Sequence, residues 1–210
     1  MREVTQSLSK AVRARHGEQM RLELEAVALG LFEVRGFGEV TVDEIAAEAG
    51  ISPRTFYRHF ATKDDVFQVR IDRFAAALRV ALGERPGDEP PVRSLREALV
   101  GVVATEDASL RRRWMLLVES SPVLIRAALG GIHLKTNAVI AEFFGLRLEH
   151  PPSGLVPTML AAAAGGVLLA ANTRWLLEGG SLEDLINEDL GVLEAIVDVR
   201  AVARHERPTS

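Results

Sequence analysis

The segment from residue 41 to residue 63 constrains the fold more than any other, because its local signals specify two short helices joined by a tight turn. Thr41, with Glu44 three residues later, matches a capping box that begins a helix. Gly50 then lets the backbone turn, and Ser52-Pro53 begins a second helix, since serine caps and proline fits the first helical position. The pattern predicts a helical hairpin.

The second helix of this hairpin has a core side and an outward side. Phe56 and Phe60 are four residues apart and share the core side, so Arg54, Thr55, Arg58 and His59 cannot all be buried. No acidic residue lies between Ile51 and Lys63, which suits an anionic polymer, and a helix-turn-helix meets DNA in this way.

We expect Arg54 to reach a guanine edge, which gives about 1–3 kcal/mol of discrimination. Ser52, Pro53 and Thr55 can add major-groove contacts, and Thr41 offers a hydroxyl and a free helix N-terminus to a phosphate. The alternative is a capped hairpin whose charges are merely solvated.

The charges are unevenly distributed along the chain. The formal net charge is −4, yet residues 1–17 contain Arg2, Lys10, Arg13 and Arg15 against the single acid Glu3. We therefore predict a flexible basic arm over residues 1–17, which could lie in a DNA minor groove, although a solubilising tail is the favoured alternative. The acidic residues lie mainly elsewhere, so a basic surface on one face is compatible with an acidic chain.

Helical periodicity continues to the C-terminus, and no segment shows convincing strand alternation. We predict an all-α protein of about nine helices, with a three-helix N-terminal DNA-binding domain and a larger helical C-terminal domain. Gly83 to Pro91 is the clearest linker, and the domain boundary is expected within or before it. The predicted domains are residues 1–17, 18–64 and 65–210. The expected helices begin near Glu18, Thr41, Ser52, Thr62, Pro91, Ser109, Pro122, Leu155 and Leu182, and the last runs to about Arg204.

The arrangement of residues 18–67 resembles the TetR family of transcriptional regulators. The matching residues are Ala28, Leu31, Phe32, Gly36 and Phe37, then Thr41, Val42, Ile45, Ala46, Ala49 and Gly50, then Ser52 to Phe60 with Thr62 and Lys63. The resemblance implies a ligand-responsive repressor in the cytoplasm, which a small apolar or amphipathic effector releases from a near-palindromic operator. It also implies that Tyr57, His59 and Lys63 contact phosphates, with Arg58 either near a phosphate or facing solvent.

The same resemblance implies a homodimer, in which two late helices of each chain form a four-helix interface. The corresponding segments here are Leu155 to Leu177 and Leu182 to Val202, and the small residues from Ala161 to Gly166 allow close helix approach. The alternative is that these apolar faces pack inside one chain. A dimer is favoured because two operator half-sites need two recognition helices.

In this family the C-terminal domain normally contains a ligand pocket. Its candidate lining residues here are Trp114, Met115, Val118, Phe143, Phe144, Met159, Asn172 and Trp175. His133, Asn137 and Thr173 are further polar residues within apolar helices, and plain core packing is the alternative for the whole set. Arg111 to Arg113 could attract an anionic ligand such as an acyl-CoA, or form a solvated helix face. Residues 111–129 also loosely resemble the mycofactocin-type branch, which is thought to bind acyl-CoA-like ligands.

Several classes of function are excluded or disfavoured. The chain has no cysteine, so it has neither disulfides nor thiolate chemistry, and residues 1–16 lack the apolar run of a signal peptide. Pro157, Asn172 and Arg174 interrupt the longest apolar stretch, which argues for a buried helix and against a membrane span. The five histidines are scattered, and no catalytic motif occurs, so we expect neither an enzyme, nor a cofactor, nor a metal site. The alternative function is a DNA-binding regulator whose C-terminal domain binds a protein and no small molecule.

Overall fold

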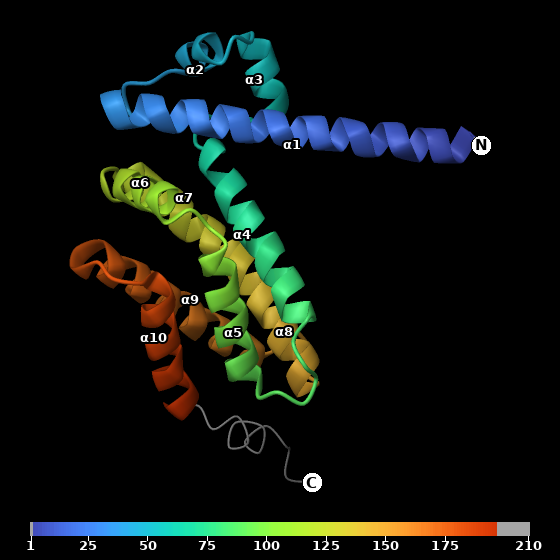
Figure 1. Ribbon diagram of the computed structural model, residues 1–210, viewed down its shortest axis with the longest axis vertical. Coiled ribbons are helices and arrows are strands. Elements are labelled where there is room, and N and C mark those ends of the chain that lie inside the picture. Colours follow the sequence, from blue (N-terminus) through green and yellow to red (C-terminus); the bar gives the residue numbers. More distant parts are fainter. Residues whose placement is uncertain (1, 197–210) are drawn as a thin grey trace. The chain divides into compact units, whose positions relative to one another are not determined.

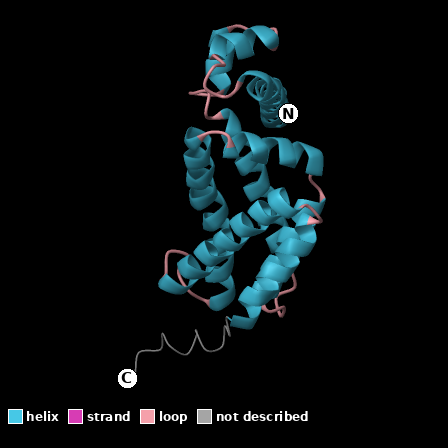
Figure 2. Cartoon of the chain, turned by 90° about the vertical axis from the view of Figure 1, so that its left-hand side faces the viewer, coloured by secondary structure: helices cyan, strands magenta, loops and turns pink. Residues whose placement is uncertain are grey.

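The computed structural model describes residues 2–196, without side chains for residues 2–14, 132 and 133. All its regular elements are helices joined by loops, and none of the described residues forms a strand (Figure 2). The all-α prediction is therefore confirmed. The helices are α1 (Arg2–Arg35), α2 (Val42–Glu48), α3 (Pro53–His59), α4 (Val66–Gly83), α5 (Pro91–Ala104), α6 (Ala108–Glu119), α7 (Pro122–Gly131), the π-helical segment η1 (Ile132–Thr136), α8 (Asn137–Leu148), α9 (Leu155–Glu178) and α10 (Leu182–Ile196).

The chain forms two compact units, and the first consists of Met1–Arg70 with Leu116–Ala128. In it α2 packs against α1 and α3, as Figure 1 shows. An aromatic cluster closes its core: the Phe32 ring lies 5.1 Å from the Phe37 ring and 5.9 Å from the Phe67 ring. These three residues come from α1, the loop after it and α4, so the cluster joins the two helices that precede and follow the hairpin in the sequence.

Helix α1 differs from the sequence prediction at its N-terminus. We expected helical spacing to begin near Glu18 after a flexible arm, but α1 begins at Arg2. Residues 2–16 contain neither proline nor glycine, so nothing in them interrupts the helical hydrogen bonds, and Gly17 alone costs only about 1 kcal/mol. The side chains of Arg2, Lys10 and Arg13 lie outside the described ones, so the minor-groove contact stays a prediction.

Helix α4 also begins later than predicted, at Val66 and not after a cap at Thr62. The residues before it form tight turns, with the amides of Asp65, Val66 and Phe67 donating to carbonyls three residues back. The capping runs in the reverse direction, since the Thr62 amide donates to the Asp65 carboxylate at 2.8 Å. The side-chain hydrogen bond before α4 is therefore made by the Asp65 carboxylate and not by the Thr62 hydroxyl.

The second unit consists of Ile71–Met115 with Leu129–Ser210. Within it α9 packs against α8 and α10, and α10 packs against α5. Its core is apolar and includes Leu78, Leu95, Phe144 and Ile186. The division falls in α4, six residues after the predicted boundary. The first unit also contains residues 116–128, which belong with residues 1–70 although they are distant in the sequence. The order of the elements does not predict this association.

The predicted helix beginning at Pro122 is one continuous run, α7, η1 and α8, which extends to Leu148. Counting it as one gives nine helices in residues 2–196, as expected. The π-helical turn widens the helix in its middle, and Lys135 in this turn pairs with Asp72 of α4 at 2.5 Å. The predicted end of the last helix near Arg204 lies outside the described residues.

Candidate nucleic-acid interface

The two short helices of the hairpin begin as the sequence predicts. The Thr41 amide donates to the Glu44 carboxylate at 2.8 Å, and the Glu44 amide donates to the Thr41 hydroxyl at 3.3 Å, which completes the capping box. The Thr55 amide donates to the Ser52 hydroxyl at 3.2 Å, and Pro53 occupies the first turn of α3. Gly50 connects the helices with φ +67, a left-handed conformation that favours glycine.

Phe56 of α3 and Phe60, which follows the end of this helix, lie in the core of the first unit. Phe56 is fully buried and Phe60 nearly so, with ring centroids 5.3 Å apart. The guanidinium of Arg21 in α1 lies over the Phe60 ring at 5.1 Å. These contacts hold one side of α3, and only its other side is available to a partner.

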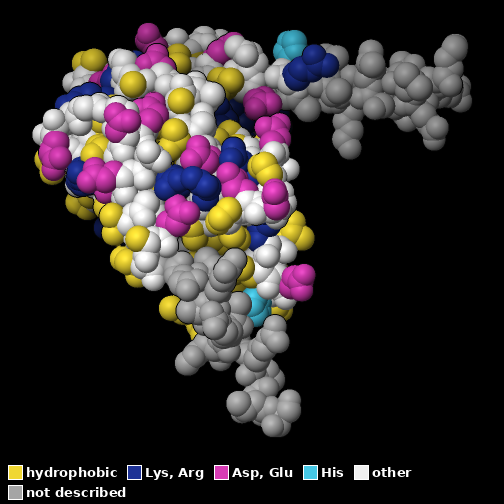
Figure 3. All heavy atoms as spheres, turned by 60° about the horizontal axis from the view of Figure 1, so that its bottom comes forward, with side chains coloured by type: hydrophobic (Ala, Val, Ile, Leu, Met, Phe, Trp, Pro, Cys, Tyr) yellow, Lys and Arg dark blue, Asp and Glu magenta, His cyan; other side chains and the backbone are white. Residues whose placement is uncertain are grey.

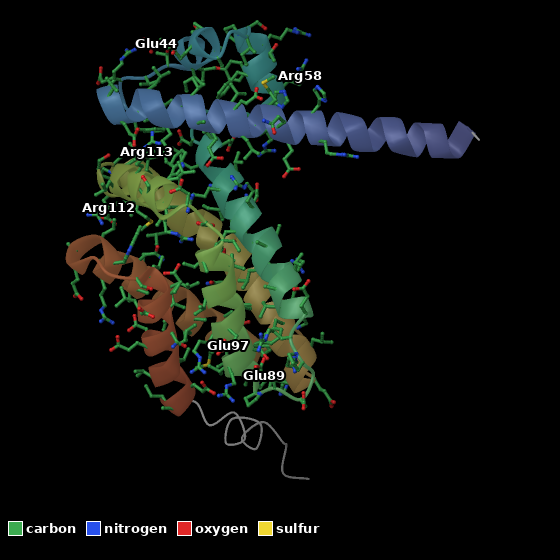
Figure 4. The ribbon with its side chains drawn as sticks, viewed as in Figure 1. Glu44, Arg58, Glu89, Glu97, Arg112 and Arg113 are labelled. Atoms are coloured by element: carbon green, nitrogen blue, oxygen red, sulfur yellow. The ribbon has the colours of Figure 1, made fainter. Side chains whose placement is uncertain are left out.

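The outward side of α3 carries the residues predicted to read bases. Arg54, Tyr57 and Arg58 are exposed, as are Ser52 and Pro53 at the helix N-terminus; Figure 4 labels Arg58 on this helix. The Thr55 hydroxyl lies 3.0 Å from the Ser52 hydroxyl, so these two groups share a hydrogen bond. An exposed arginine beside hydroxyls on a rigidly held helix is suited to bidentate contact with a base edge.

His59 is half-buried at the end of α3, and its pKa is lowered. Burial disfavours the charged imidazole most, and the neighbouring charges of Arg58 and Arg21 add to the effect. In the free protein the His59 imidazole is therefore harder to protonate than an exposed histidine. Arg21 was not among the predicted site residues, and its distance in sequence from α3 concealed its proximity.

Lys63 occupies a position that the sequence analysis did not anticipate. Its ammonium donates to the carbonyl of Phe37 at 2.6 Å and to that of Val40 at 2.7 Å, and it lies 4.3 Å from the centre of the Phe37 ring. Two of its three N–H groups thus bind the loop between α1 and α2. A phosphate contact remains a proposal for the third.

Thr41 is exposed, but its donors are engaged by Glu44. The Thr41 hydroxyl donates to the carboxylate at 2.9 Å, and Arg35 pairs with the other carboxylate oxygen at 2.8 Å. The Thr41 amide hydrogen bond, followed by the Arg35 and Thr41 side chains, lowers the pKa of Glu44 to about 2. The carboxylate is therefore ionised at neutral pH, and the N-terminus of α2 is less open to a phosphate than predicted.

The predicted ligand-binding residues are dispersed. Trp114, Phe144 and Trp175 are buried, and the Trp175 indole donates to the Gly180 carbonyl at 3.2 Å. Met159 is exposed, and Met115 and Val118 are half-buried. The Asn172 amide donates to the Leu168 carbonyl of its own helix. Only Phe143 of the predicted set lines the cavity described next.

The second unit contains a cavity of about 440 Å³ between the end of α4, the loop after it and α8. Leu82, Val139 and Phe143 form part of its apolar wall, while Arg79, Arg85, Arg147 and Glu142 supply charged groups. Arg79 pairs with Glu142, and Arg147 donates to the carbonyls of Pro86 and Gly87 at 2.5 Å each. The site is thus apolar with a basic rim. This cavity is partly open to solvent, and the alternative of a C-terminal domain that binds a protein and no small molecule stays a prediction.

The predicted dimer helices combine core contacts with an exposed apolar stripe. On α9, Leu155, Met159, Leu169 and Leu177 are exposed at helical spacing, and Val192 and Ile196 are exposed on α10. The two glycines of α9 differ: Gly165 is buried against Asn137 of α8, and Gly166 is exposed with open space around it. Close approach at Gly165 therefore occurs inside one chain.

The three consecutive arginines of α6 have different environments. Arg111 is buried and pairs with Glu106, while Arg112 and Arg113 are exposed and labelled in Figure 4. Arg112 lies over the Trp175 ring at 6.0 Å. Only two of the three are accessible to an anionic ligand. Elsewhere charges are mixed, and on the face seen in Figure 3 acidic side chains lie beside basic ones.

Two helical runs of the described chain are long and apolar enough to cross a membrane by composition alone, Pro122–Leu148 and Leu155–Glu178. The second, α9, places nine residues in the core, and its Arg174 pairs with Asp189 at 2.6 Å. These are the contacts of a core helix, as the sequence predicts. Residues 15–131 and 134–196 contain no group of His, Asp and Glu able to hold a metal ion.

Comparison with known proteins agrees with this geometry. The family model for bacterial regulatory proteins of the tetR family matches residues 25–69, and the model for the MftR C-terminal domain matches residues 89–198. The hairpin lies within the first match. The exposed stripe of α9 and the α8 side of the cavity lie within the second.

Individual relatives extend the comparison. The chain is 29% identical over 174 residues to the mycofactocin biosynthesis transcriptional regulator MftR of Mycobacterium tuberculosis, covering 82% of this chain and 88% of that protein. It is 34% identical over 122 residues to the transcriptional regulator TcmR of Streptomyces glaucescens, and the match spans only 54% of TcmR. The crystal structure of Thermus thermophilus FadR, a transcriptional repressor in complex with lauroyl-CoA, matches with a TM-score of 0.56 and 25% identity, covering 84% of this chain and 95% of that one.

Proposed function

Because the chain belongs to the TetR family, with an MftR-type C-terminal domain, and is a DNA-binding transcription regulator and not an enzyme, we propose that it is a homodimeric repressor. A small apolar or amphipathic effector releases it from a near-palindromic operator. The observation that carries the proposal is the two-sided helix α3, whose phenylalanines are buried while Arg54, Tyr57 and Arg58 face outward. Such a regulator acts in the cytoplasm, where a bacterial operator lies.

In the proposed complex, Arg54 contacts a guanine, and Ser52, Pro53 and Thr55 contact neighbouring bases. Tyr57, Arg58 and His59 bind phosphates, which fix the register of α3 in the groove without reading sequence. Thr41 and Lys63 add phosphate contacts only through groups that their internal hydrogen bonds leave available. The two α3 helices of a dimer would then enter successive major grooves, about 34–36 Å apart.

The DNA proposal is tested by selecting duplexes from a random-sequence library with the purified protein, then measuring their affinity at several salt concentrations. Wild-type protein should select a near-palindrome. Arg54→Ala should lose about 1–3 kcal/mol of discrimination at one base position in each half-site. Arg58→Ala is the matched control, because losing a phosphate contact weakens all sequences alike and lowers the salt slope by about 0.9. If Arg54→Ala keeps the wild-type sequence preference, Arg54 does not read a base.

The dimer is supported by the apolar stripe of α9 and α10. Leu155, Met159 and Leu177 are each more than half exposed, and an exposed stripe of this length on a soluble regulator marks a protein contact. A two-fold interface uses the same patch from both chains, as two matching half-sites require. Sedimentation equilibrium should give twice the mass of 22.9 kDa; a monomer at micromolar concentration would contradict it.

The effector proposal is supported by the 440 Å³ cavity, whose apolar wall and basic rim suit a molecule with an apolar body and an acidic group. The FadR structure of similar fold contains lauroyl-CoA. Helix α4 contributes Leu82 to the cavity wall and continues from the first unit into the second. An effector that tilts α4 would change the spacing of the two recognition helices, so that ligand and DNA favour different states.

Two measurements test this mechanism. Lauroyl-CoA, with free coenzyme A as control, is titrated into the complex with the selected duplex while fluorescence anisotropy reports release, and mass spectrometry identifies small molecules retained by the purified protein. Release of the duplex by lauroyl-CoA, without release by free coenzyme A, supports an amphipathic effector. Crystal structures with and without effector that show the same separation of the two Tyr57 residues would refute the tilting mechanism.

A further inference from the structure

Lys63 joins the start of α4 to the loop that leads into the DNA-binding hairpin. Its ammonium donates to two carbonyls, those of Phe37 at 2.6 Å and Val40 at 2.7 Å, and it lies 4.3 Å from the centre of the Phe37 ring. Val40 and Phe37 are both buried, so neither carbonyl-bearing residue can move outward without opening the core. One side chain thus supplies two charge-assisted hydrogen bonds and a cation–π contact to five residues of loop.

This loop determines where α2 begins. Val40 directly precedes Thr41, whose backbone and hydroxyl form the capping box with Glu44. Gly36, at the other end of the loop, adopts φ +83 and so turns the chain out of α1. Between these fixed points, the carbonyls of residues 37 and 40 point to one cation in the turn that precedes α4. The placement of the hairpin relative to the start of α4 therefore depends on Lys63.

We propose that Lys63 is a positioning residue for DNA binding: by holding the loop from Gly36 to Val40 against the start of α4, it fixes the orientation in which the hairpin meets DNA. This role differs from a phosphate contact, because it operates in the free protein. It rests on the DNA-binding function proposed above, and it also makes the start of α4 the point at which a movement of that helix reaches α2.

The two roles predict different salt dependence. A phosphate contact releases counterions, so its loss lowers the slope of log K against log salt by about 0.9. Loss of the loop contact lowers affinity at every salt concentration and leaves the slope unchanged, because no ion-pair to DNA is lost. Breaking two charge-assisted hydrogen bonds should reduce affinity about tenfold, which corresponds to ~1.4 kcal/mol.

The test compares full-length Lys63→Met, Lys63→Arg and the matched control Arg58→Met with the wild-type protein. Hydrogen exchange over residues 36–48 is measured without DNA, and affinity for the selected duplex is measured at several salt concentrations and at a temperature where every variant is fully folded. Lys63→Met should speed exchange about tenfold and weaken binding about tenfold, and the slope then shows whether the third N–H also contacts a phosphate. Lys63→Arg, which keeps a donor cation, should restore part of both. Arg58→Met should leave exchange unchanged and lower the slope.

Each other outcome is informative. Unchanged exchange in Lys63→Met together with a slope lowered as in Arg58→Met would overturn the proposal and make Lys63 a phosphate contact only. Faster exchange without weaker binding would overturn the positioning role, because the loop would then be irrelevant to DNA. Faster exchange with a lower slope would support it and assign the third N–H to a phosphate. If no duplex is selected, the DNA-binding proposal fails, and the exchange result still shows whether Lys63 holds the loop.

Discussion

Replacing Gly165 by alanine tests how closely α9 and α8 approach inside the second unit. A Cβ at Gly165 would lie 2.5 Å from the side-chain oxygen of Asn137, closer than such atoms pack, so that side chain or a helix must shift. The next residue, Gly166, is exposed, and a Cβ there would meet nothing within 4 Å. Two adjacent glycines in one helix thus form a matched pair that differs only in surroundings.

The magnitude follows from two opposing contributions. Alanine is favoured over glycine within a helix by about 1 kcal/mol at both positions. At residue 165 this gain is offset by overpacking, which costs about 1–3 kcal/mol in a close-packed core. Gly166→Ala should therefore raise the free energy of unfolding by about 1 kcal/mol, and Gly165→Ala should fall below it by about 1–3 kcal/mol.

Urea unfolding followed by tryptophan fluorescence measures this difference in the relevant part of the chain. The chain has two tryptophans, Trp114 and Trp175, and both belong to the second unit. Unfolding is repeated over a range of protein concentrations, since a dimer interface makes stability depend on concentration. Equal stability of Gly165→Ala and Gly166→Ala would refute the close approach to Asn137. A loss in Gly166→Ala that grows with concentration would place that glycine in the dimer interface.

Two further predictions concern charged groups. Because the pKa of Glu44 is lowered to about 2 from 4.5, its ionised form stabilises the folded state above pH 4.5, and this contribution is lost as the pH falls toward 2. Glu44→Gln should therefore lower the temperature of thermal unfolding at pH 7, and circular dichroism should show the difference from wild type vanishing near pH 2; a constant difference would exclude ionisation as its cause. Arg147→Gln removes the hydrogen bonds to Pro86 and Gly87 and should lower the free energy of unfolding by about 1–2 kcal/mol, with faster hydrogen exchange confined to residues 84–90. Unchanged exchange there would show that Arg147 does not hold this loop.

Local signals predicted most of the hairpin. The capping box of Thr41, the cap at Ser52 and the burial of Phe56 and Phe60 all depend on residues within four positions of one another, so spacing alone specifies them. Two helix starts were nevertheless predicted wrongly from the sequence. Asp65 caps the turn before α4 backwards onto Thr62, and α1 continues to Arg2 because nothing interrupts it.

The candidate ligand site was less predictable than the hairpin. An aromatic residue in an apolar helix has the same sequence pattern whether it fills the core, as Trp175 and Phe144 do, or lines a cavity, as Phe143 does. Phe143 and Phe144 are adjacent, so the choice depends on which way each side chain points. The basic rim of the cavity brings Arg79, Arg85 and Arg147 together from two helices and a loop, and no spacing rule connects them.

The sequence by itself determined the all-helical class, the hairpin and the side of α3 that can meet DNA, because these follow from interactions between neighbours in the chain. Only the tertiary structure decided which groups the cation of Lys63 binds. Lys63 carries the same charge whether it faces a phosphate or the carbonyls of Phe37 and Val40, and only the fold brings a loop 23 to 26 residues away within 2.7 Å of it. Charge is a property of the residue, while the acceptor it finds is a property of the packed chain.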